Sequence, residues 1–218
     1  MTTSTDTSPR ATPPDLAGLR AQLQALLQWQ SQHLDAGSTA LDAAGLTAGL
    51  AAFAHTQAAR WQSEQLKLWQ RVEASIGRQL AAQPMFPLHG GLAPLAALDD
   101  APARRRGPLG LDLCALLRNP DCVLDEADEL DLAIRYWEAA RRVLPGVELD
   151  FGSFWRDFEW AALASHLGLL AGQIATQAAP QRCLLAHIVR TATRYIELKP
   201  LTLLIDAAGL MDNTFTLR

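Results

Sequence analysis

The chain has little lysine, cysteine or asparagine, and it has no long apolar run. Lys67 and Lys199 are the only lysines, so arginine carries nearly all the positive charge of the 218 residues. The formal net charge of −4 excludes a general electrostatic attraction to nucleic acid or to an anionic membrane. No apolar run is long enough to span a bilayer.

The three cysteines, Cys114, Cys122 and Cys183, have no CxxC spacing and no neighbouring histidine pair. We therefore expect free thiols in a reducing compartment, which indicates a cytoplasmic protein. The first residues, MTTSTDTSPRATPP, are polar and have no apolar core, so they are not a secretory signal. A disordered tail is expected over residues 1–14.

Hydrophobic residues make up 49% of the chain, which suits a single globular domain over residues 15–212. The spacing of apolar residues is helical almost throughout, so the expected fold class is mainly α. One helix, over 125–144, begins with acidic and ends with basic residues, and we interpret this charge run as a solvated face. Helices are expected at about 15–34, 41–80 (with a break or kink near its glycines), 109–118, 125–144, 151–178, 180–197 and 200–208.

The stretch from Met85 to Asn119 is the one long interruption of this pattern. Prolines forbid a continuous helix there, and they stand at positions 84, 87, 94, 102 and 108. Short extended pieces are predicted at 85–88 and 95–98. The fold therefore contains at most a short hairpin around residues 85–100.

The interrupted stretch also holds most of the candidate chemistry. His89, Asp99 and Asp100 are too few and too poorly spaced to predict a transition-metal site. A Ser-His-Asp hydrolase is excluded because no serine occurs between Gly77 and Phe151.

Two further features of the stretch leave alternatives open. Arg104, Arg105 and Arg106 are candidate contacts for a phosphate or carboxylate, the alternative being a solvated turn. Gly90 and Gly91 lack the glycine spacing and the lysine of a P-loop, which favours a plain turn.

Three segments resemble one family of enzymes. They are GPLGLDL at 107–113 with LLR at 116–118; IRYWE at 134–138, DFGSFWRDFEW at 150–160 and HL at 166–167; and RYIELKPL at 194–201. Together they are similar to the helical C-terminal lobe of aminoglycoside-phosphotransferase-like kinases, closest to the branch that acts on cell-wall amino sugars. The resemblance implies a protein-kinase-like C-lobe and, in an active member, ATP and magnesium as cofactors.

The catalytic loop of that family reads H-x-D-x-x-x-x-N, in which the Asp is the base and the Asn holds magnesium. His89 matches the first position, but Gly91 stands at the base position and Ala96 at the metal-amide position. Asp100 matches the spacing of a second metal-binding Asp, so it is a candidate metal ligand. We therefore expect no catalytic residue, with His89 and Asp100 left as parts of a former catalytic loop.

The resemblance also implies an N-terminal lobe with a phosphate-covering loop and a strand lysine, and neither is expected in this sequence. The expected function is that of a degenerate, pseudokinase-like module that binds a protein partner or a second copy where that lobe would sit, with no bound cofactor. Two alternatives stay open: residual ATP-dependent phosphotransfer to a sugar hydroxyl, and an unrelated helical structural protein.

Overall fold

A computed structural model describes the chain over residues 14–35, 38–100 and 103–211. The predicted tail over 1–14 lies almost wholly outside these residues, as does residue 212. The described helices and strands are α1 (Leu16–Gln32), β1 (Thr39–Ala40), α2 (Ala43–Gln57), α3 (Ser63–Ala82), β2 (Met85–Leu88), β3 (Arg105–Pro108), α4 (Gly110–Leu117), α5 (Glu126–Val143), α6 (Phe151–Ala175), α7 (Arg182–Arg194), the short 3-10 helix η1 (Ile196–Leu198) and α8 (Lys199–Ala207).

The predicted fold class is confirmed: the described chain is mainly helical, with a small sheet in the order β1-β3-β2. The hairpin pairs β2 with β3 in antiparallel register, from Met85 opposite Pro108 to Leu88 opposite Arg105. The second strand therefore lies beyond the predicted range, and residues 95–98 form a turn and irregular backbone instead. A two-residue strand, β1, adds to β3 in parallel.

Aspartate side chains begin four of the helices. Asp15 accepts a hydrogen bond from the backbone N–H of Gly18, and Asp42, Asp125 and Asp150 cap α2, α5 and α6 in the same way. Such caps satisfy N–H groups that have no partner within the helix. None of the described helices is long and apolar enough to cross a membrane.

The long helical region over 41–80 breaks after Gln57 rather than at a glycine. Gly49 lies inside α2, where a Cβ would stand 2.6 Å from the carbonyl oxygen of Ala164 and 3.2 Å from the Cα of Gly168. This glycine therefore allows α2 to approach α6 closely. It does not kink the helix.

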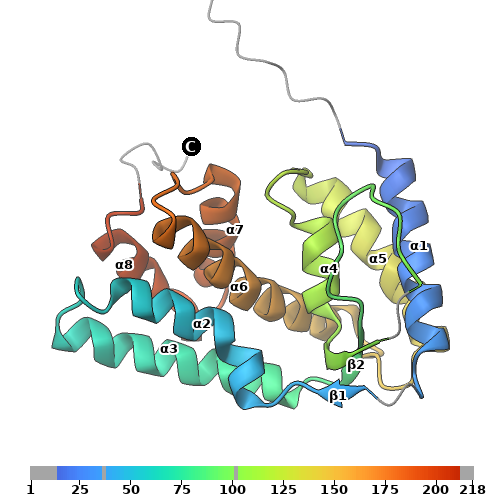
Figure 1. Ribbon diagram of the computed structural model, residues 1–218, viewed down its shortest axis with the longest axis horizontal. Helices are drawn as coiled ribbons and strands as arrows, with labels where there is room; N and C mark the ends of the chain where they lie inside the picture. The colour runs from blue at the N-terminus through green and yellow to red at the C-terminus, as the bar shows by residue number, and fades with distance from the viewer. Residues whose placement is uncertain (1–13, 36–37, 101–102, 212–218) are drawn as a thin grey trace, which may run out of the picture.

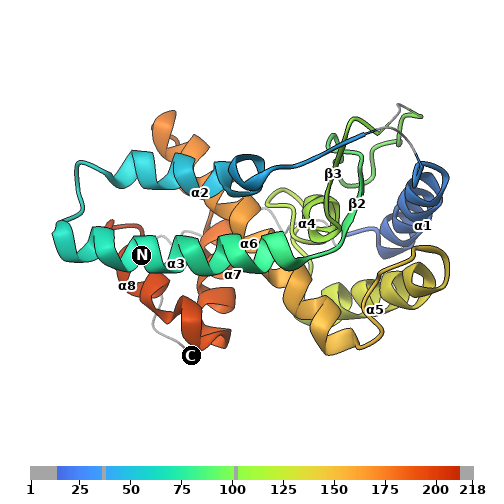
Figure 2. The same cartoon turned by 90° about the horizontal axis from the view of Figure 1, so that it is seen from below.

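Helix α6 lies in the middle of the molecule and belongs to two apolar cores (Figures 1 and 2). Its Trp160, Leu163 and Leu167 pack in a first core with α2, α3, α7 and α8. Its Phe154 and Phe158 pack in a second core with α1, α4, α5 and β2. The loop after β2 and the strand β3 lie on the second-core side, where the candidate site is found.

Candidate ligand-binding cleft

A loop that follows β2 forms the floor of the candidate site, and Asp112 of α4 holds it in place. The Asp112 carboxylate accepts hydrogen bonds from the backbone N–H of His89 (2.9 Å) and of Gly90 (3.1 Å). Asp112 is 3% exposed, and this burial raises the pKa of its carboxyl, while the two backbone N–H groups act in the opposite direction. The loop is therefore fixed by a buried side chain of the GPLGLDL segment.

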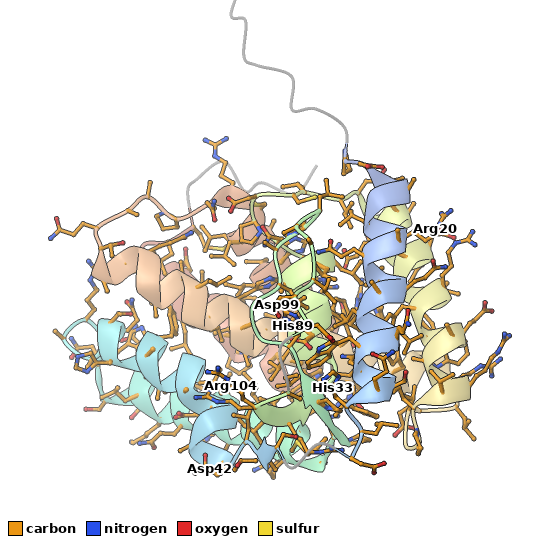
Figure 3. The ribbon with its side chains drawn as sticks, turned by 45° about the vertical axis from the view of Figure 1, so that its right-hand side comes forward. Arg20, His33, Asp42, His89, Asp99 and Arg104 are labelled. Carbon is orange, nitrogen blue, oxygen red and sulfur yellow. The ribbon has the colours of Figure 1, made fainter. Side chains whose placement is uncertain are left out.

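His89 faces Asp99 across the cleft floor (Figure 3). Its Nε2 lies 3.1 Å from Asp99 Oδ1 and 3.3 Å from the carbonyl oxygen of Asp99. Because both neighbours are acceptors, this nitrogen carries the hydrogen and donates a hydrogen bond. The other ring nitrogen, Nδ1, is buried and has no hydrogen-bond partner among the described residues. The ring also makes an edge contact with Trp29 of α1.

Asp100, the candidate metal ligand, is exposed and does not line the cleft. The structure brings Asp99 to His89 instead. Within the described ranges, no group of three or more His, Cys, Asp or Glu residues could hold a metal ion.

A turn over residues 93–96 is attached to α1 by Gln22. The Gln22 amide donates to the carbonyl oxygens of Ala93 (2.8 Å) and Ala96 (2.9 Å) and accepts from the backbone N–H of Leu95 (2.8 Å). Leu95 has φ +62°, a conformation that costs a non-glycine residue energy. Ala96 thus lies in a turn that is stabilised by a helix side chain.

The two glycines of the loop have different roles. Gly90 has φ +72°, which favours glycine over any other residue. Gly91 does not, and a Cβ built on it would have only His89 Nδ1 nearby, at 3.9 Å. Position 91 therefore has room for a side chain, which this sequence does not supply.

The three arginines of the stretch separate into two kinds. Arg106 donates to the carbonyl oxygens of Leu34 (2.6 Å) and Met85 (3.0 Å), so its guanidinium joins the end of α1 to β2. It does not line the cleft, which disfavours its prediction as an anion contact. Arg104 and Arg105 do line the cleft, are exposed, and are the remaining candidates.

The resulting cleft has a volume of about 690 Å³ and mixes polar and apolar walls. This size suits a small-molecule ligand. The residues that line it are Leu41, Leu88, His89, Gly90, Gly91, Leu92, Asp99, Arg104, Arg105, Leu111, Asp112 and Ala115.

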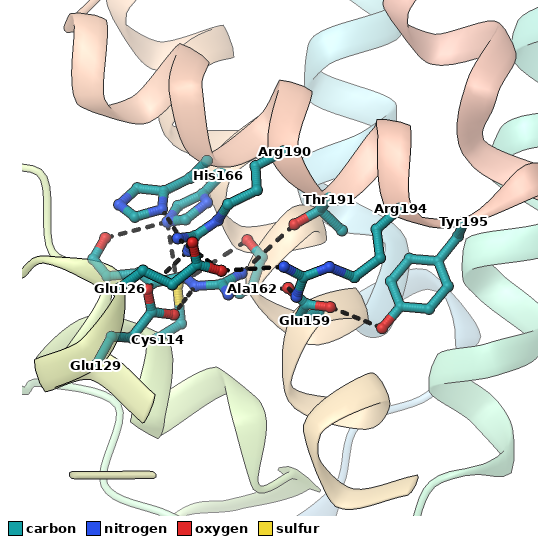
Figure 4. A network of polar contacts seen from close by, with 12 residues as sticks. Cys114, Glu126, Glu129, Glu159, Ala162, His166, Arg190, Thr191, Arg194 and Tyr195 are labelled. Carbon is teal, nitrogen blue, oxygen red and sulfur yellow. Dashed lines mark hydrogen bonds and ion pairs between the residues drawn. The ribbon is translucent and has the colours of Figure 1, made fainter. Parts of the chain in front are cut away.

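A second polar cluster lies beneath the surface, and it is a structural junction of four helices (Figure 4). Arg118, at the end of α4, is 1% exposed and pairs with Glu129 of α5 and Glu159 of α6. Arg190 and Arg194 of α7 pair with the same two carboxylates, at 2.7 Å and 2.6 Å. Our interpretation of the acidic start of α5 as a solvated face is therefore wrong for Glu129, which is buried because it neutralises Arg118.

The fold and the cleft thus define a helical protein with a preformed polar site next to a short hairpin. Over 167 residues, the chain is 32% identical to an N-acetylmuramate/N-acetylglucosamine kinase from Neisseria meningitidis serogroup B. The alignment includes 67% of this chain and 49% of the relative, so the chain spans about half the length of that protein. The similarity supports a sugar-kinase-like family. No protein-family model matches the chain, and no solved structure matches it significantly.

Sequence reasoning missed three residues that shape the cleft. The sequence offers Asp99 only beside Asp100, as a candidate metal ligand, and gives no signal for its contact with His89. Asp112 had a signal in its motif, because an acidic residue in a short apolar helix needs a buried partner. Gln22 had no signal, because its contacts are more than 70 residues away in the sequence.

Proposed function

We propose that this chain is a pseudokinase-like protein of the sugar-kinase-like family, whose cleft binds a ligand without transferring a phosphoryl group. The observation that carries the proposal is glycine at position 91, in a loop that Asp112 otherwise holds in place. A positioned base contributes roughly 10²–10⁴ to the rate of such a reaction. Ala96, in addition, has no side-chain oxygen for magnesium.

The carboxylates that line the cleft do not replace the missing base in this proposal. Asp99 accepts a hydrogen bond from His89, and Asp112 accepts from two backbone N–H groups. In this proposal both carboxylates hold the loop rather than accept a proton from a substrate hydroxyl.

The test is an assay of phosphoryl transfer. The purified chain is incubated with ATP, magnesium and either N-acetylglucosamine or N-acetylmuramate, with the Neisseria relative as the positive control. We expect no sugar phosphate above the rate without protein. Turnover that depends on the chain and on magnesium would contradict the proposal.

A variant that restores the missing groups sharpens this test. Gly91→Asp combined with Ala96→Asn adds the base and the metal-binding amide to a backbone that has room at position 91. Activity in this variant but not in the natural sequence would assign the loss to these two positions.

The second candidate is residual phosphotransfer, with ATP and magnesium as cofactors. It is favoured by the preformed polar cleft, in which Asp99 stands beside His89. A magnesium-dependent rise in melting temperature with ATP that is lost in Asp99→Asn would support it.

The proposal extends to partners and to location. We propose that the face beside the cleft contacts a protein partner or a second copy of the chain, and that the protein is cytoplasmic. Sedimentation of the purified chain over a range of concentrations tests self-association, and a monomer at every concentration would argue against a second copy.

A further inference from the structure

Two arginines, Arg104 and Arg105, form a positively charged wall of the cleft. Arg104 and Arg105 are consecutive and exposed, and neither guanidinium has an ion pair or a hydrogen bond with a described residue. The chain as a whole carries a net charge of −4, so this wall is a local exception. Two arginines that present free N–H groups to one cleft are suited to a phosphate or a carboxylate.

The same cleft has an unsatisfied polar atom on its floor. The His89 side chain is only 7% exposed, and its Nε2 is already engaged by Asp99. Its buried Nδ1 has no partner in the described part of the chain, and it is the atom nearest to the vacant side-chain position of Gly91. A buried acceptor without a partner is costly, so a group that hydrogen-bonds to it from the Gly91 side is stabilising.

We infer that the cleft binds a small hydroxyl-bearing molecule with one oxyanion, and that it does so without magnesium. The oxyanion, a phosphate or a carboxylate, lies against Arg104 and Arg105, and a ligand hydroxyl donates to His89 Nδ1. The negative charge of Asp99 beside His89 disfavours the opposite orientation. The two arginines supply the positive charge that a metal ion would otherwise bring.

This inference rests on the proposed function in one respect, since both place the ligand in this cleft. Measurements of phosphoryl transfer and of metal dependence distinguish the inference from the proposed function. Phosphoryl transfer by the chain would contradict the proposed function and leave the oxyanion site standing. Absence of oxyanion binding would contradict the inference and leave the lack of catalysis standing.

Calorimetric titration of the full chain in EDTA tests the inference. The probes are glucose 6-phosphate, N-acetylmuramate, the neutral N-acetylglucosamine and inorganic phosphate. We expect the two charged sugars to bind at least roughly tenfold more tightly than the neutral one, because a charge-assisted hydrogen bond is worth more than 1.4 kcal/mol. Equal affinity for charged and neutral sugars, no binding of any charged probe, or binding that needs added magnesium would each overturn the inference.

Variants assign the two ends of the site. Arg104→Gln and Arg105→Gln should each weaken binding of the charged sugars by roughly tenfold. Arg71→Gln, which removes an exposed arginine of α3, should have no effect. Unchanged affinity in both cleft variants would place the ligand elsewhere and overturn the inference.

The histidine end has its own readout. In the free protein, the ¹⁵N chemical shift of His89 Nδ1 should be that of an imidazole nitrogen that accepts no hydrogen bond. This chemical shift should change on addition of glucose 6-phosphate. Gly91→Ala, which fills the space beside Nδ1, should weaken binding of the sugar but not of inorganic phosphate, while Gly172→Ala on open helix surface serves as its control. A resonance that stays in place at saturation would remove His89 from the site.

Discussion

At the scale of single residues, Gln22 holds the turn that lies between the cleft residues Leu92 and Asp99. Its side chain is 6% exposed and makes three hydrogen bonds to the turn at 93–96. Leu95 keeps its positive φ only because surrounding contacts compensate for the strain. A buried glutamine of α1 therefore determines the path of a loop that its own backbone disfavours.

Replacement of Gln22 by alanine should release this turn. We expect the free energy of unfolding to fall by about 1–3 kcal/mol, because the Leu95 N–H and the Ala96 carbonyl lose their partner and the Ala93 carbonyl keeps only the hydrogen bond from the Ala96 N–H. Hydrogen exchange at Leu95 should become faster. Gln24→Ala, at an exposed position two residues further along the same helix, is the matched control. Equal effects of the two substitutions would show that helix propensity, and not the loss of contacts to the turn, is responsible.

Two buried histidines, one from α6 and one from α7, stack with ring centroids 5.3 Å apart. Burial lowers the pKa of His166 to about 4 and that of His187 to about 3, and the neighbouring Arg118 and Arg190 charges act in the same direction. Both rings are therefore neutral in the folded protein at pH 7. In the unfolded chain the pKa of a histidine is near 6.5.

This difference predicts a loss of stability in acid. The contribution is complete above pH 6.5 and is lost as the pH falls toward 4, because the unfolded chain binds protons that the folded one excludes. For His166, we expect a decrease of about 2–3 kcal/mol between pH 6.5 and 4.5. Urea unfolding at each pH measures it.

A comparison of histidine variants with the natural sequence assigns the pH dependence, because the contributions of carboxyl groups such as Asp112 are the same in each protein and cancel in the difference. His166→Gln should have a shallower decline than the natural sequence over that interval, and His55→Gln, on an exposed position, should not. Parallel curves for all three proteins would mean that the decline comes from other groups.

At the scale of helices and strands, the Arg118 junction joins α4, α5, α6 and α7 through buried charges. The Arg118 guanidinium donates to Glu159 at 3.1 Å and lies over the Phe158 ring, 4.8 Å from its centroid. A buried ion pair contributes little net stability, yet removal of one partner leaves a charge without compensation. The junction therefore orients the helices against one another and makes each member hard to replace.

Arg118→Met should reduce the free energy of unfolding by roughly 3 kcal/mol, the lower end for a broken buried pair, because Arg190 and Arg194 still partly neutralise the two glutamates. Arg135→Met removes an exposed arginine that pairs with Asp131, and it should change the free energy of unfolding far less, because solvent screens an exposed pair. Chemical denaturation of both variants measures the difference. A cost for Arg118→Met as small as that of the exposed pair would refute the role of the junction.

Much of the element pattern could be predicted from the sequence, because local chemistry decides it. Asp15 begins α1, and apolar spacing marks the long helices, so their bounds lie within a few residues of those observed. The strand pairing could not be predicted in the same way. Residues 105–108 read as a basic turn, and only their contact with β2 makes them a strand.

The site was predictable in part for a related reason. The local loop pattern predicts that Gly91 and Ala96 replace a catalytic base and a metal-binding amide. Nothing in the structure tests this interpretation, so it stays a proposal. Asp112 and Gln22 act across long sequence separations, and the close approach at Gly49 depends on α6, more than a hundred residues later. Such contacts are a property of the folded chain, so spacing within one segment does not report them.

At the scale of the whole molecule, the two apolar cores share one helix. Trp160 of α6 belongs to the first core and Phe158 to the second, although they are only two residues apart. Neither core can keep its packing if α6 unwinds, so the described residues should unfold in one cooperative step rather than two. Tryptophans lie in both cores, with Trp61 and Trp69 in the first and Trp29 in the second, so fluorescence reports on each.

A pair of cavity-forming substitutions tests this coupling. Leu50→Ala removes a fully buried side chain of the first core, and Leu113→Ala removes one of the second. Each should lower the free energy of unfolding by about 2–5 kcal/mol. Each should also shift a single transition that circular dichroism and tryptophan fluorescence report at the same denaturant concentration. If the cores were independent, each substitution would shift only part of the unfolding transition, and circular dichroism and fluorescence would report different midpoints. Because α6 contributes side chains to both cores, we expect the two midpoints to coincide.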